Sequence, residues 1–311
     1  FALVGSTGDF TNHLDNDGGS NKIGIISQWD PVGGAVEEVV KFPDMDDQSF
    51  LVIPRSISDS QVRLTNGDYN GLAASAISRN DCADGRDNNV LALFSPPAPN
   101  VFFPDENNTV EDNKVCSAAF VALNRDATRR ASSSFDPDST GHHFVTFFDI
   151  SSNPERIVKV PVEGRNPADI EFSPDGQFVF VAAYNGKTVE LIRYELDSAS
   201  EDPSALPLGT IPVGNRPIKI TVNDQRNEIM VANYFSNTVT VINANGSVGE
   251  EAALGNLQTG AGPMDLVLNN TGDRAYVANS LEGTVTVLEA TNSGSNCAGG
   301  WCVVDTYELS Q

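Results

Sequence analysis

Basic residues and histidine are scarce in this chain. Its 311 residues include 19 Lys and Arg against 42 Asp and Glu, with three His, so the formal net charge is −23. Because nucleic acids are bound through clusters of Lys and Arg, this charge argues against a nucleic-acid partner, and it opposes docking on anionic membranes. The sequence also has no run of about 18 apolar residues and therefore predicts no direct membrane insertion.

Familiar catalytic motifs are missing as well. The sequence contains no Gly-x-Ser-x-Gly elbow, no Gly-rich phosphate loop and no dinucleotide-binding fingerprint. It therefore shows no recognised nucleophile or nucleotide site. This pattern favours a non-enzymatic protein over an enzyme.

Cysteine is rare, and its four copies are Cys82, Cys116, Cys297 and Cys302. An even number in an acidic chain suits disulfides and an oxidising location, either extracellular, at the cell surface or periplasmic. The spacing favours a Cys297–Cys302 bond, which leaves Cys82 to pair with Cys116. A zinc site is the alternative, although neither pair has two-residue spacing and no His lies near them.

Turn-forming residues are abundant, with 26 Gly and 17 Pro, and they punctuate an internal repeat in the second half. Three segments begin at Pro167, Pro217 and Pro263, at intervals of 50 and 46 residues. Each contains three short apolar or alternating runs with turn signals between them, and a fourth run follows. Four strands in 40–50 residues are typical of one blade of a β-propeller.

Two repeat motifs carry a family resemblance. Tyr276-Val-Ala-Asn and Asn237-Thr-Val-Thr-Val resemble the YVTN-type β-propeller repeat of surface-layer and secreted proteins. The segment also looks like the blades of the lactonase family of propellers. The resemblance covers about residues 160–290. It implies a propeller fold and an exported protein, and it says little about function.

Weaker strand pairs, each interpreted as the second and third strands of a blade, continue the repeat towards the N-terminus. We identify them at Phe1–Gly5 with Asn21–Ile26, Ala73–Ser78 with Asn89–Phe94, and Ala118–Leu123 with Phe144–Ile150. The sequence therefore predicts an all-β chain in which residues 1–311 form a single β-propeller of six or seven four-stranded blades. Long loop insertions are expected within 6–20, 79–117 and 124–143.

The histidines fall in two of these insertions, each beside carboxylates. We interpret these residues as a candidate metal site shared by two loops: His13, Asp15, Asp17, Asp136, Asp138, His142 and His143. Imidazole with carboxylate suits a transition metal, whereas acidic loops such as Asp15–Gly19 suit calcium. Solvated polar loops without any ion remain the simpler alternative, so no cofactor is certain.

Three further polar residues occupy equivalent repeat positions near the starts of the predicted first strands. Asp169, Lys219 and Asp265 are expected to line the central channel. A ring of carboxylates with one Lys has the groups for acid–base chemistry, but such polar linings are also common in propeller channels.

These observations favour one functional hypothesis and leave two alternatives open. The first is an exported, non-enzymatic binding scaffold that presents its loop insertions to a protein, glycan or cell-surface partner. The second is a metal-dependent lactonase-like hydrolase, with a cation held over the channel. The third is an envelope protein for metal binding or electron transfer.

Overall fold

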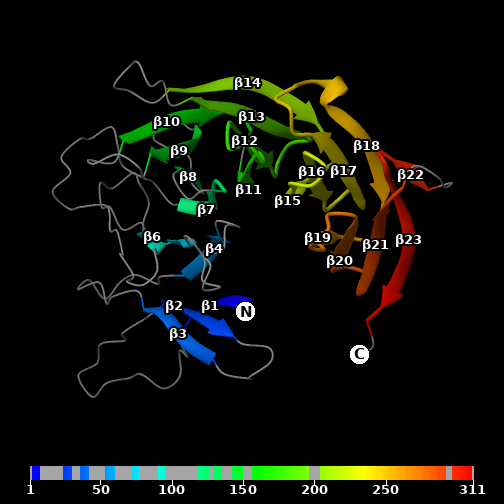
Figure 1. The fold of residues 1–311 in the computed structure, drawn as a ribbon, viewed down its shortest axis with the longest axis horizontal. Helices are drawn as coiled ribbons and strands as arrows, with labels where there is room; N and C mark the ends of the chain where they lie inside the picture. The colour runs from blue at the N-terminus through cyan, green and yellow to red at the C-terminus, as the bar shows by residue number, and fades with distance from the viewer. Residues whose placement is uncertain are drawn as a thin grey trace.

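The chain folds into antiparallel sheets arranged around a common centre (Figure 1). The structure is a computed structural model that describes residues 2–7, 24–29, 36–41, 53–59, 72–77, 90–94, 118–125, 129–134, 142–149, 156–164, 166–195, 204–291 and 296–309. For the strands up to residue 94 it describes the backbone. Every strand pairing in these ranges is antiparallel.

The first two sheets have three described strands each, and the third has four. The first sheet consists of β1 (Ala2–Thr7), β2 (Gly24–Trp29) and β3 (Val36–Lys41). The second consists of β4 (Ile53–Asp59), β5 (Leu72–Ile77) and β6 (Val90–Phe94). The third consists of β7 (Ala118–Leu123), β8 (Arg129–Ser134), β9 (His143–Asp149) and β10 (Arg156–Val162).

The last three sheets correspond to the internal repeat. The fourth sheet consists of β11 (Pro167–Phe172), β12 (Phe178–Ala183), β13 (Thr188–Glu195) and β14 (Ser204–Pro212). The fifth consists of β15 (Pro217–Asn223), β16 (Glu228–Asn233), β17 (Thr238–Asn243) and β18 (Ala253–Gln258), with a 3₁₀ turn, η2 (Glu250–Ala252), before β18. The last sheet has the order β19-β20-β21-β23-β22, from β19 (Pro263–Leu268), β20 (Arg274–Asn279), β21 (Thr284–Ala290), β22 (Cys297–Ala298) and β23 (Trp301–Glu308).

A side-chain ladder explains why the Asn and Thr of the repeat recur. Asn233, at the end of β16, donates from Nδ2 to the hydroxyls of Thr238 and Thr240, at 3.2 and 2.8 Å. Asn279, at the end of β20, makes the same two bonds in the last sheet, at 3.0 and 2.9 Å. These bonds tie the second strand to the third and satisfy amide donors that the fold buries. The motif is therefore structural.

Side chains from neighbouring sheets fill the space between them. Phe147 of β9 and Tyr194 of β13 stack with their ring centroids 4.9 Å apart and join the third sheet to the fourth. Phe180 of the fourth sheet shares a buried cluster with the fifth, and Met230 of the fifth shares one with the last. Sheets packed face to face around a centre, with β7, β11, β15 and β19 innermost (Figure 1), fit a β-propeller.

Among the described strands, none covers one face of the last sheet. Phe180 and Met230 are fully buried against the sheet that follows them, whereas Tyr276, at the equivalent position of β20, is 38% exposed. The fourth strands show the same contrast in exposed fraction. Ile211 (0%) and Leu257 (2%) are buried, whereas the equivalent Tyr307 is 56% exposed. The described strands do not close the ring between the first sheet and the last. The face around Tyr276 and Tyr307 therefore has the residues of a sheet-to-sheet interface. Among the described residues, no neighbouring sheet packs against it.

Two expectations about the first half of the chain need correction. The segment within 124–143, expected to be a loop insertion, contains the strand β8, which pairs with both β7 and β9. Residues 118–123 and 143–149 are therefore first and third strands of their sheet. Likewise β1 is the first strand of its sheet and packs beside β4. The insertions within 6–20 and 79–117 lie largely outside the described residues, which include only Ser6 and Thr7 of the first and β6 of the second.

Within the described ranges, the helical element is the short 3₁₀ turn η2. Among the described residues, no helix has the length and apolar character that a membrane crossing needs.

Candidate functional site

The three predicted channel residues come together on the innermost strands. Asp169 lies on β11, Lys219 on β15 and Asp265 on β19. Lys219 Nζ lies 2.8 Å from Asp169 Oδ2, which also accepts a hydrogen bond from the Ile220 backbone N–H at 2.8 Å. Asp265 Oδ1 accepts from the Leu266 backbone N–H at 2.9 Å. The ion pair thus fastens β11 to β15 at the inner edge of both sheets.

A β-bulge precedes each of these three residues. The register shifts between Pro167 and Asp169, and in the same way before Lys219 and Asp265. A bulge adds one residue to a strand and changes the direction in which the next side chain points. Because the shift recurs at the same repeat position, we attribute the convergence of the three side chains to the repeat itself.

The charges around Lys219 keep its amine protonated. Burial alone would lower the pKa of Lys219, but the carboxylates of Asp169, Glu171 and Asp265 outweigh it and raise the pKa above its ordinary value. The amine therefore serves as a fixed cation at neutral pH. It can donate hydrogen bonds or stabilise negative charge, and it is not available as a base.

A cavity opens beside this cation. It has a volume of about 920 Å³ and lies along β15 and β19, extending to the turns that follow these strands. Its lining is mostly polar and includes Glu171, Lys219, Thr221, Gln225 and Asn270. A volume of this size suits a small ligand, and the polar groups suit a ligand rich in hydroxyl groups.

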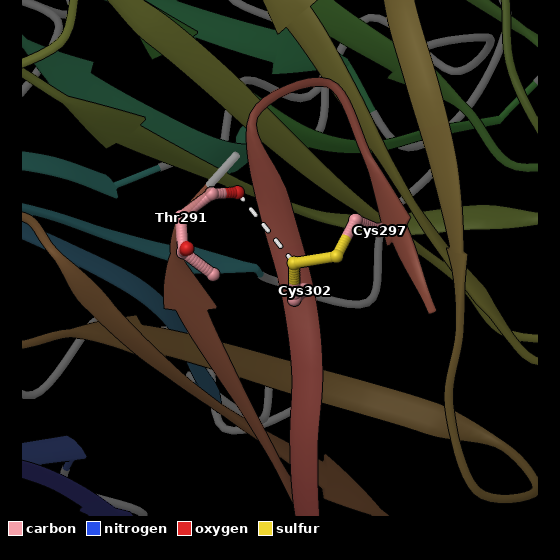
Figure 2. The surroundings of a disulfide bond; sticks show 3 residues. All are labelled: Thr291, Cys297 and Cys302. Carbon is pink, nitrogen blue, oxygen red and sulfur yellow. Dashed lines mark hydrogen bonds between the residues drawn. A yellow bond between two sulfur atoms is a disulfide. The ribbon is translucent and has the colours of Figure 1, made fainter. Parts of the chain in front are cut away.

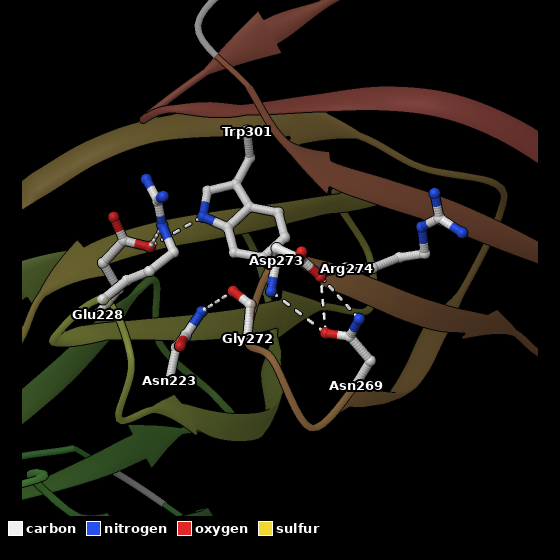
Figure 3. Close-up of polar contacts among 8 residues, drawn as sticks. Asn223, Glu228, Asn269, Gly272, Asp273, Arg274 and Trp301 are labelled. Atoms are coloured by element: carbon white, nitrogen blue, oxygen red, sulfur yellow. Dashed lines mark hydrogen bonds and ion pairs between the residues drawn. The ribbon is translucent and has the colours of Figure 1, made fainter.

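Side-chain hydrogen bonds, drawn in Figure 3, order the two turns that line the end of the cavity. Asn223 Nδ2 donates to the Gly272 carbonyl at 2.8 Å and links the two turns. Asn269 Oδ1 accepts from the backbone N–H groups of Asp273 and Arg274, at 3.2 and 3.1 Å. Gly272 has a positive φ of 66°, and a Cβ there would lie 2.5 Å from Asn223 Oδ1. The turn consequently requires glycine at this position.

Asp224 is a carboxyl group at this rim whose pKa is raised. Burial raises the pKa of Asp224, and the nearby charge of Arg125 opposes this effect. Both residues also line a small adjoining cavity of about 30 Å³, together with Glu171. A carboxyl group with a raised pKa in a cleft is a candidate acid or base.

The predicted metal site is mostly beyond what the structure describes. His13, Asp15, Asp17, Asp136 and Asp138 lie outside the described residues. His142 is exposed just before β9, whereas His143 is buried in β9, opposite Val162 of β10. The alternation of side chains along a strand separates the two imidazoles. Within the described ranges, no three His, Cys, Asp or Glu residues group as a metal site. The calcium or transition-metal site stays a prediction.

One of the two predicted disulfides is present. Cys297 and Cys302 are bonded and form a cross-strand pair of the β22–β23 hairpin (Figure 2). Gly299 and Gly300 make the two-residue turn, both with positive φ, as this tight hairpin requires. Thr291 approaches the bond, with its carbonyl oxygen 3.5 Å from Cys302 Sγ. Cys82 and Cys116 lie outside the described residues.

Sequence reasoning missed a second cluster of polar and aromatic side chains. The Arg216 guanidinium carbon lies 4.0 Å from the ring centre of Phe235 and 4.9 Å from that of Tyr184. Arg216 Nη1 donates to Tyr184 Oη at 3.0 Å. The sequence did contain a signal for this cluster. Arg216 occupies the position before the first proline of its repeat, where the other two repeats have Asn166 and Gly262.

Comparisons with known proteins give the fold but no family. No family model matches the chain, and no curated protein matches its sequence. Among solved structures, a functionally unknown protein from Desulfotomaculum acetoxidans has a TM-score of 0.62 at 15% identity, over 91% of this chain and 76% of that one. A periplasmic gluconolactonase from Pseudomonas aeruginosa has a TM-score of 0.58 at 15% identity, over 94% and 79%. A chain of a mitotic checkpoint complex has a TM-score of 0.60 at 11% identity, over 94% and 76%.

Proposed function

We propose that this protein is an extracytoplasmic β-propeller that binds a sugar-type ligand in the cavity along β15 and β19. The observation that carries the proposal is the combination of a protonated Lys219, carboxylates and amide side chains in one cavity of about 920 Å³. Sugar hydroxyls both donate and accept hydrogen bonds. The amine supplies donors, the carboxylates supply acceptors, and the amides supply both.

Two observations support a location outside the cytoplasm. Disulfides persist in oxidising compartments, and Cys297 and Cys302 form one. A structure with a similar fold is that of a periplasmic enzyme. The protein or glycan partner expected at the loop insertions belongs to the same proposal, since a glycan can present the sugar that the cavity takes.

We also propose that residues 1–311 form one ring of six blades, closed where the first sheet covers the open face of the last. The support is the repeat, because the positions equivalent to Tyr276 and Tyr307 are buried in the two preceding sheets. Apolar side chains on such a face gain stability when a neighbouring sheet covers them.

Hydroxyl-radical footprinting tests this closure. In the full chain, Tyr276 and Tyr307 should be oxidised several-fold more slowly than Tyr184 and Tyr234, which are half-buried in the turns that follow β12 and β16. The buried Tyr194 gives the rate of a protected ring. Oxidation of Tyr276 and Tyr307 at least as fast as that of Tyr184 would contradict the closed ring.

Ligand titration tests the binding function. We expect D-glucose, D-gluconate or a short neutral oligosaccharide to bind, as followed by saturation-transfer NMR. The double variant Gln225→Ala with Asn270→Ala should weaken binding at least about fivefold, because it removes two exposed amides from the cavity lining. Gln177→Ala, which removes an exposed amide outside the cavity, is the matched control. Equal binding by the double variant and the control would refute the cavity as the site.

Hydrolysis of a sugar lactone is the second candidate function. The similarity to a periplasmic gluconolactonase and the raised pKa of the Asp224 carboxyl group favour it. In that mechanism Asp224 would act as a base that takes a proton from the attacking water, and it would return this proton to the ring oxygen released when the lactone C–O bond breaks. Adding D-glucono-1,5-lactone to the same NMR titration separates the two functions. If the rate of lactone opening with the protein exceeds the rate in buffer alone, the protein catalyses hydrolysis.

A further inference from the structure

A second polar and aromatic cluster lies at the other end of β15 from the cavity. Arg216 immediately precedes the strand, whereas the cavity extends past its last residue, Asn223. Tyr184 and Phe235 come from the turns that follow β12 and β16. At about 3.3 Å per residue, Arg216 lies roughly 10 Å along the strand from Lys219, the lining residue of β15 that comes first in the chain, and the cavity extends away from Arg216. Arg216, Tyr184 and Phe235 do not line the cavity, so the cluster lies outside the proposed ligand cavity.

Arg216 occupies a backbone position that suits other residues better. Its φ is 56°, and the equivalent residues Asn166 and Gly262 have φ of 56° and 67°. In each repeat the carbonyl at this position accepts a backbone N–H from the turn after the second strand, at 3.0 Å from Tyr184, 2.9 Å from Tyr234 and 2.8 Å from Ser280. The backbone therefore has the same hydrogen bond at this turn in all three repeats. Glycine and asparagine tolerate a positive φ, and arginine tolerates it poorly.

The surroundings of Arg216 suggest why an arginine stands there. Three other cations of the last three sheets have carboxylate partners: Lys219 with Asp169, Arg226 with Glu228, and Arg274 with Glu289. Within the described residues, the side-chain interactions of Arg216 are with the two rings and the Tyr184 hydroxyl. In a chain of net charge −23, a guanidinium with aromatic partners keeps its hydrogen-bonding edge for a ligand.

We propose that Arg216, Tyr184 and Phe235 form a second binding site, which takes a carboxylated sugar such as a uronate. The planar guanidinium matches a carboxylate with two parallel hydrogen bonds. The Phe235 side chain is 50% exposed and offers an apolar surface to the C–H face of a sugar ring. The large negative net charge disfavours a doubly charged phosphate more than a singly charged carboxylate.

The test compares galacturonate, galactose and glucose 6-phosphate by saturation-transfer NMR on the full chain. Wild type should bind galacturonate at least about tenfold more tightly than galactose and more tightly than the sugar phosphate. The galacturonate trimer, added in a separate arm, distinguishes a uronate within a polysaccharide from the free sugar. Equal binding of galacturonate and galactose, or a preference for glucose 6-phosphate, would overturn the proposal.

Arg216→Asn is the informative variant, because asparagine already occupies this turn at Asn166. It should weaken galacturonate binding at least about tenfold and leave the Tm within about 2 °C of wild type. Lys187→Asn removes an exposed cation from the neighbouring turn and is the matched control, with binding changed less than about twofold. Unchanged binding in Arg216→Asn would overturn the proposal. A Tm of Arg216→Asn that is lower by more than about 5 °C would also overturn it, since the main role of Arg216 would then be to stabilise the packing of the two sheets.

Discussion

Trp301→Ala is expected to lower the free energy of unfolding by about 3–5 kcal/mol. Trp301 is the first residue of β23 and is fully buried between the last two sheets. Its Nε1 donates to Glu228 Oε2 at 2.8 Å, as Figure 3 shows. The same oxygen accepts from Arg226 Nε at 2.9 Å, and the Arg226 guanidinium lies over the indole at 5.5 Å. The substitution therefore creates a cavity and removes a buried hydrogen bond together.

Urea unfolding followed by far-UV circular dichroism measures this effect without relying on tryptophan fluorescence. Trp301→Phe is the control that separates the two contributions, because it keeps most of the apolar volume and removes the donor to Glu228. We expect it to cost about 1–3 kcal/mol. If Trp301→Ala costs less than about 1 kcal/mol, the outer strand of the last sheet does not dock on the fifth sheet as described.

Lys219→Met is expected to cost about 3 kcal/mol, because it leaves Asp169 buried without its cation. Asp169 is only 6% exposed, and its remaining hydrogen bond from the Ile220 N–H cannot neutralise the charge. The double variant Asp169→Asn with Lys219→Met should recover much of the loss, because two contacting residues are not additive. Full additivity of the two single variants would contradict the ion pair.

The pH dependence of this pair has a defined sign. The pKa of Lys219 is raised in the folded protein. Its contribution to stability is therefore complete below the unfolded value of 10.5 and is lost only as the pH rises beyond it. The stability difference between wild type and Lys219→Met should consequently show no loss from Lys219 titration between about pH 6 and 9. Unfolding curves at pH 6, 7.5 and 9 check this.

The second half of the fold could be predicted because the same sequence pattern occurs in three repeats and forms the same strands in each. Asn233 and Asn279 recur where their amides bond the Thr hydroxyls of the next strand. Asp169, Lys219 and Asp265 could be grouped in advance because equivalent repeat positions lie at equivalent places on the inner strands. The Gly299–Gly300 turn likewise explains why the Cys297–Cys302 spacing was informative.

Other features could not be predicted, since they depend on neighbours in space. Strand β8 reads Arg-Arg-Ala-Ser-Ser-Ser, with no alternation of apolar residues, and it is a strand because β7 and β9 pair with it on both sides. The cavity combines residues of β15 and β19, which lie about 46 residues apart in the repeat. The raised pKa of Asp224 depends on burial, which no local motif reports.

The most direct test of the central claim is a crystal structure of the protein soaked with the sugar ligand that binds most tightly in the NMR titration. We predict electron density for the ligand between β15 and β19, within hydrogen-bond distance of the amides of Gln225 and Asn270. Ligand density elsewhere on the molecule, with the cavity holding solvent alone at saturating ligand, would contradict the account.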